Sequence, residues 1–127
     1  MKKQNFNIIM ILIFVPIVDI FNKYIFNDWQ FIISLGVVIT IDTILGFAYA
    51  AKSDGISSWK FMKVVYKFII YFFLLIATHN VAHYSVNGKE NTILLWIDTI
   101  MYAVIMCREL ISIMENCGKL GIIIPAW

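Results

Sequence analysis

The sequence predicts an all-α integral membrane protein with about four transmembrane helices and both termini in the cytoplasm. Composition is the first reason: 61% of the 127 residues are hydrophobic and 14% are charged, whereas a soluble domain carries about 25% charged residues. The second reason is that apolar segments recur along the chain and are long enough to approach the roughly 30 Å thickness of the hydrocarbon core. The uneven placement of basic residues is the third. We expect one membrane domain over residues 1–127, with helices at about 6–26, 29–51, 59–84 and 92–117.

The first apolar segment, residues 6–26, follows Lys2 and Lys3 and contains Pro16 and Asp19. Membrane helices tolerate proline where neighbouring groups satisfy the freed carbonyl, so we expect this segment to span the membrane. A shallow helix is the alternative, because the uninterrupted apolar part is short. No small-residue cleavage site follows the apolar run, which indicates an uncleaved signal anchor.

The second helix, residues 29–51, contains a single charged residue, Asp42, near its middle. A carboxylate at that depth costs about 2.5 to 3.5 kcal/mol on insertion scales, so it must face protein or water. At about 100° per residue, Gly46 and Ala50 lie within about 80° of Asp42 around the helix. Small residues beside a polar one are typical of close helix packing in membranes. We expect this face to pack on another helix, with Asp42 either directly functional or merely neutralised inside the bundle.

The turn before the third helix contains Asp54 and Gly55, a strong turn pair. At the start of that helix, Lys60, Lys63 and Lys67 are spaced so that they share one face. We interpret them as a basic face that anchors the helix to anionic lipid, with a binding site for a partner as the alternative.

His79 and His83 follow with i, i+4 spacing near the end of the third helix. That spacing suits a metal ion, but only distant acids could supply a third ligand, and the glutamate of a zinc-protease helix is missing. We therefore expect no metal here and place both histidines at the outer interface of the membrane.

The fourth helix, residues 92–117, carries its polar residues in one stripe: Asp98, Glu109, Ser112 and Asn116. On a helical wheel all four lie within about 40° of Asp98. We expect this stripe to meet the face of Asp42 and Gly46, either within one subunit or across neighbouring subunits. Trp127 closes the chain and is expected at the membrane interface.

Eight of the ten Lys and Arg residues lie at the amino end, in residues 52–67 or in residues 108–119. The two loops that would lie outside hold only Lys23 and Lys89. By the positive-inside rule, this distribution places both termini in the cytoplasm. The cysteines stand ten residues apart, about 15 Å along one helix, which is too far for a disulfide and fits a reducing compartment.

No enzyme signature is present: the chain has no phosphate-binding glycine loop, nucleophile elbow or set of metal ligands. We expect no enzymatic activity and no cofactor. The net charge of +2 is too small to indicate nucleic-acid binding. The informative residues are the intramembrane acids, which either fix the bundle by interhelical hydrogen bonds or line a polar path.

Two motifs resemble those of the toxin-secretion and phage-lysis holin family. The first is Asp42-Thr-Ile-Leu-Gly46-Phe-Ala48 after an apolar run. The second is Glu109-Leu-Ile-Ser112-Ile-Met-Glu-Asn116, followed by Gly121 and Pro125. The resemblance covers about residues 31–125, and its second motif is quite specific.

The resemblance implies a small phage protein of the bacterial inner membrane, without a catalytic site. Such a protein self-associates at a set time into lesions that release a cell-wall hydrolase (an endolysin) or an exported toxin and end the membrane potential. Two hypotheses that assign the chain to other functional classes of membrane protein remain open. One is an antiholin or membrane adaptor, and the other is a small ion channel or transporter. Against the latter, no inverted repeat or broken helix is seen.

Overall fold

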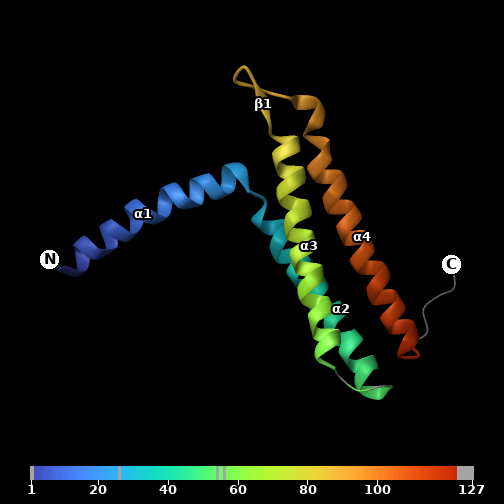
Figure 1. The fold of residues 1–127 in the computed structure, drawn as a ribbon. Coiled ribbons are helices and arrows are strands. Elements are labelled where there is room, and N and C mark those ends of the chain that lie inside the picture. Colours follow the sequence, from blue (N-terminus) through green and yellow to red (C-terminus); the bar gives the residue numbers. More distant parts are fainter. Residues whose placement is uncertain (1, 26, 54, 56, 123–127) are drawn as a thin grey trace.

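The computed structural model describes residues 2–25, 27–53, 55 and 57–122. Four long helices dominate this part of the chain (Figure 1), with the bounds α1 Lys2–Tyr24, α2 Trp29–Lys52, α3 Ser58–Ala82 and α4 Trp96–Lys119. Between α3 and α4 lie a short hairpin, β1 Ser85–Val86 and β2 Lys89–Glu90, and a 3-10 turn, η1 Thr92–Leu94. The prediction of four helices is therefore confirmed, and the short hairpin is an addition that the sequence did not predict. Three residues from the sequence predictions, Asp54, Pro125 and Trp127, lie outside the described residues.

The helices α2, α3 and α4 run alternately up and down, and α4 packs along both of the others. Figure 1 shows α1 directed away from these three, and only its end meets them: it contacts α3, and Phe21 and Asn22 contact Trp29 at the start of α2. By length and composition, α2 and α3 qualify as membrane spans among the described helices. Four crossings and two cytoplasmic termini therefore stay predictions.

Local sequence explains where the helices begin. Asp28 caps α2, because its Oδ1 accepts a hydrogen bond of 3.1 Å from the backbone N–H of Phe31. Before α4, Asn91 caps the 3-10 turn instead by accepting from Ile93 N–H at 3.1 Å. The fourth helix therefore begins at Trp96, four residues later than predicted.

The hairpin between α3 and α4 turns at Asn87 and Gly88, with φ angles of 53° and 74°. Positive φ at both central residues is the geometry that Asn-Gly favours in two-residue hairpins. This turn brings the start of α4 back beside the end of α3, so that residues near the two helix ends face each other.

In the part of the chain that the structure describes, five buried side chains form one small core cluster: Leu35, Ile39, Tyr71, Leu75 and Ile105. Large apolar side chains are otherwise exposed along whole helix faces, as at Ile33, Phe73 and Ile100. A soluble protein of this size rarely exposes such continuous apolar surface. In a membrane protein, lipid covers these faces.

Candidate functional site

Six polar side chains from three helices meet inside the bundle. We call them the polar cluster: Asp42 from α2, Lys67 and Tyr71 from α3, and Glu109, Ser112 and Asn116 from α4. Helical periodicity explains the grouping, because cluster residues on the same helix are three or four positions apart and so share a face. The cluster joins both α2 and α3 to α4.

Lys67 is the centre of the polar cluster. Its Nζ lies 2.7 Å from Asp42 Oδ2 and 3.1 Å from Glu109 Oε2. The remaining carboxylate oxygens are bonded as well: Ser112 Oγ donates to Asp42 Oδ1 at 2.7 Å, and the Tyr71 hydroxyl donates to Glu109 Oε1. Asn116 Nδ2 donates a second bond to Asp42 Oδ1, at 2.9 Å. Every carboxylate oxygen of the cluster thus has a partner, as buried acids require.

Burial makes this arrangement energetically important. Glu109 is 0% exposed and Asp42 6%, and the Lys67 side chain is 24% exposed. Two carboxylates therefore face one ammonium in surroundings from which most water is excluded. Removing one partner of a buried ion pair typically costs about 3 to 5 kcal/mol, because the other charge is left uncompensated.

A polar recess of about 370 Å³ opens from the cluster toward the loop that joins α2 and α3. Its lining includes Asp42, Gly46 and Asn116, together with the four lysines Lys60, Lys63, Lys67 and Lys119. This recess connects the buried Asp42 carboxylate with the basic end of the bundle.

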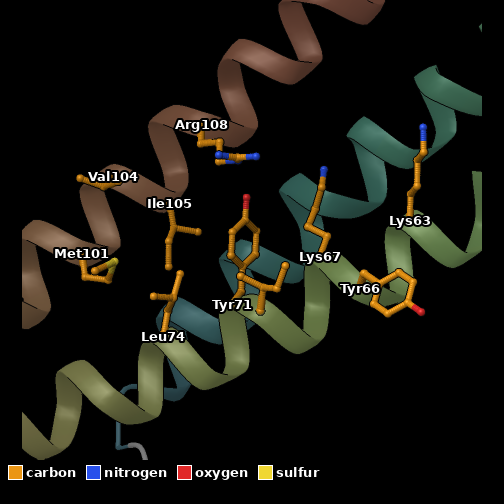
Figure 2. Close-up of a pocket in the computed structure, with 10 residues that line it drawn as sticks. Lys63, Tyr66, Lys67, Tyr71, Leu74, Met101, Val104, Ile105 and Arg108 are labelled. Carbon is orange, nitrogen blue, oxygen red and sulfur yellow. The ribbon is translucent and has the colours of Figure 1, made fainter.

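A second, more apolar hollow of about 530 Å³ lies between α3 and α4. Figure 2 shows its polar end, where Lys67 and Tyr71 extend from α3 and Arg108 stands on α4. At its other end the walls are aliphatic, with Leu74 and Val104 among them. Hollows thus border the polar cluster, although its two carboxylates are themselves buried.

Of the small residues on the Asp42 face of α2, Gly46 lies beside α4. Ala50 is buried at 2% exposure. A Cβ atom added at Gly46 would lie 3.5 Å from Asn116 Nδ2. The absence of a side chain at Gly46 therefore leaves room for Asn116, which binds Asp42. The neighbouring atom is part of a side chain and not of the α4 backbone.

The basic face of α3 divides in the structure. Lys63 is exposed, and the Lys60 ammonium donates to the Gly55 carbonyl at 3.1 Å, so both lie near the start of α3, and their role as lipid anchors stays a prediction. Lys67 instead turns inward to Asp42 and Glu109. We therefore correct the grouping of Lys67 with the lipid-anchoring lysines, because its ammonium pairs with two buried carboxylates.

Asp98 does not join the polar cluster, although it shares the stripe of Glu109, Ser112 and Asn116. It lies near the other end of α4, where its Oδ2 is 3.0 Å from His83 Nε2 and 3.8 Å from His79 Nδ1. The stripe predicted as one surface thus meets two different sets of partners, because α4 is long enough to reach both ends of α3. Sequence reasoning also missed Tyr71, whose hydroxyl donates to Glu109.

A family model described as the bacteriophage holin family matches residues 19–127. The match covers both motifs, Asp42 to Ala48 and Glu109 to Asn116, and all residues of the polar cluster. It confirms the family predicted from these motifs. Comparisons with curated proteins and with solved structures gave no match.

Proposed function

We propose that this chain, which belongs to the bacteriophage holin family, accumulates in the bacterial inner membrane and assembles with copies of itself into lesions. These lesions release an endolysin, or an exported toxin, and end the membrane potential. The family match over residues 19–127 carries the proposal. The exposed apolar helix faces support it, since they suit a chain that is stored in lipid before it acts.

In the proposed topology all four helices cross the membrane and both termini are cytoplasmic. The basic end of the bundle, with Lys52, Lys60, Lys63 and Lys119, then lies at the cytoplasmic face beside anionic lipid. The helix α4 is the most polar of the three bundle helices, and it crosses with Asp98 and Glu109 turned to α3 rather than to lipid.

The polar cluster supplies a physical basis for delayed action. While Lys67 holds both carboxylates, the chain exposes apolar surface to lipid and keeps its buried charges compensated. If α4 separates from α2 and α3, those groups need water, and a ring of chains can supply it by lining a common opening. The closed chain is thus the stored form, and opening of the cluster is the step toward a lesion.

Expression in a bacterium tests the function. The chain together with an endolysin that has no signal peptide should, after a delay, collapse the membrane potential and lyse the cells. The chain alone should depolarise without lysis, and the endolysin alone should do neither. A voltage-sensitive dye and culture density report the two events. Normal growth with the chain present in the membrane would instead favour the antiholin or adaptor function.

Thiol labelling tests the topology, using the native Cys117 near the end of α4. In a Cys107→Ser background, a membrane-impermeant maleimide should label Cys117 only after the cytoplasmic face is opened. A matched variant without either native cysteine but with Ser85→Cys, in the hairpin between α3 and α4, should be labelled in intact spheroplasts. Labelling of Cys117 in intact spheroplasts would overturn the proposed orientation.

A further inference from the structure

A second cluster of ionisable side chains lies at the opposite end of the bundle, apart from the polar cluster. It consists of His79 and His83 on α3 and Asp98 on α4. One ligand atom from each residue can be chosen so that all three lie within 4.8 Å of one another. His79 is 1% exposed and Asp98 7%, so the groups are fixed by packing rather than loosely placed at the surface.

These three residues have the chemistry of a transition-metal site. Imidazole nitrogens and a carboxylate oxygen are the ligands that Zn²⁺ takes, at about 2.0 to 2.2 Å, in a tetrahedral arrangement. Ligand atoms around such an ion are roughly 3.3 Å apart, which follows from those bond lengths. Asp98 Oδ2 lies 3.0 Å from His83 Nε2 and 3.8 Å from His79 Nδ1. These two distances lie on either side of that value.

The hydrogen bonding of His79 favours a cation at this place. Its Nε2 lies 3.1 Å from the backbone carbonyl oxygen of Lys23, which only accepts, so Nε2 carries the proton. In the neutral ring Nδ1 then presents its lone pair toward the Asp98 carboxylate, and two electron-rich atoms face each other. A metal ion between them removes that conflict. A carbonyl that holds the distal N–H is also the usual support of a metal-binding histidine.

The Asp98 carboxylate supports the same conclusion. Its Oδ1 is buried and has no hydrogen-bond partner within the described part of the chain. A buried carboxylate whose second oxygen is unsatisfied is costly unless a cation compensates it. Both histidines also line an open cavity of about 340 Å³, with Glu90 of the hairpin on its wall. An ion can therefore enter from the loop side, and Glu90 or water can fill a fourth position.

We propose that His79, His83 and Asp98 form a binding site for a divalent transition-metal ion of the Zn²⁺ type. The bound ion joins the end of α3 to the beginning of α4 and, through the His79–Lys23 hydrogen bond, also holds the end of α1. This inference does not depend on lesion formation. It reverses the sequence-based expectation of no metal. That expectation held that the acids are too distant to supply a third ligand, whereas the hairpin brings Asp98 beside the two histidines.

Titration of the purified, chelator-treated chain in detergent with Zn²⁺ alone tests the proposal. We expect one ion per chain, a higher unfolding temperature with the ion bound, and, with Co²⁺ as a probe, the visible absorption of a tetrahedral complex. His83→Gln and Asp98→Asn should each weaken binding by at least about 100-fold, since loss of even a supporting residue costs about 10- to 100-fold.

Two further variants make the result decisive. Asn80→Ala, on the same helix and exposed, should bind like the original chain, and Glu90→Gln reports whether the hairpin supplies a ligand. His83→Gln is the safer ligand variant, because its side chain is 29% exposed and the fold depends less on it. Absence of stoichiometric Zn²⁺ binding, or equal binding by His83→Gln and the original chain, would show that these residues form only a His–Asp hydrogen bond.

Discussion

Replacement of Lys67 by Met should destabilise the closed bundle more than any other single change in the polar cluster. Methionine keeps the unbranched apolar stem and is one atom shorter than lysine. In the original chain Asp42 and Glu109 share one ammonium, and in the variant they become two uncompensated buried carboxylates. We expect the free energy of unfolding in detergent to fall by about 3 to 5 kcal/mol. Circular dichroism against temperature measures this loss.

The same variant should also act earlier in cells. If the closed chain is the stored form, a weakened cluster opens at a lower membrane concentration, so depolarisation should begin sooner at equal protein level. Immunoblotting of membrane fractions shows whether the variant and the original chain are present in equal amounts. If the variant is less stable but depolarisation begins at the same time, opening of the polar cluster does not set the time of lesion formation.

Matched variants distinguish lost charge compensation from other effects. Lys63→Met removes an exposed ammonium one helical turn away and should change stability little. Glu109→Gln leaves one carboxylate with one ammonium and should be milder than Lys67→Met. The triple variant Lys67→Met, Asp42→Asn, Glu109→Gln has no uncompensated charge and should recover much of the lost stability. If Lys67→Met is as stable as Lys63→Met, the ion pairs do not hold the bundle.

Sequence patterns predicted the helices and the inward face of α2 well, because apolar periodicity and the cost of a buried acid act within one helix. They placed Lys67 wrongly because a wheel shows which residues share a face but not how deep each lies. The depth of each residue follows from the number of residues between it and the helix end at the basic end of the bundle. Asp42, Lys67 and Glu109 each lie nine or ten residues from the nearest helix end there, Lys52, Ser58 or Lys119, which is about 14 to 15 Å. Because Lys67 lies at the same depth as Asp42 and Glu109, this count predicts that its ammonium pairs with their carboxylates.

The same reasoning explains the error at Asp98. Eleven residues separate Asp98 from Glu109 on α4, and twelve separate Lys67 from His79 on α3, so the two intervals span about 16 and 18 Å. In antiparallel helices Asp98 must therefore reach the level of the histidines when Glu109 reaches Lys67. Periodicity alone could not show this, since it carries no information on which neighbouring helix a polar residue meets.

Gly46→Leu should separate α2 from α4 without affecting membrane insertion, since leucine inserts at least as well as glycine. Even a Cβ at this position lies 3.5 Å from Asn116 Nδ2, so the larger side chain must displace the amide that binds Asp42. Overpacking of this kind costs about 1 to 3 kcal/mol, and we expect a lower unfolding temperature in detergent and earlier depolarisation. Gly36→Leu is the matched control, because a Cβ there meets nothing within 4 Å. Equal unfolding temperatures and equal timing for the two variants would show that contact of Gly46 with α4 does not hold the bundle closed.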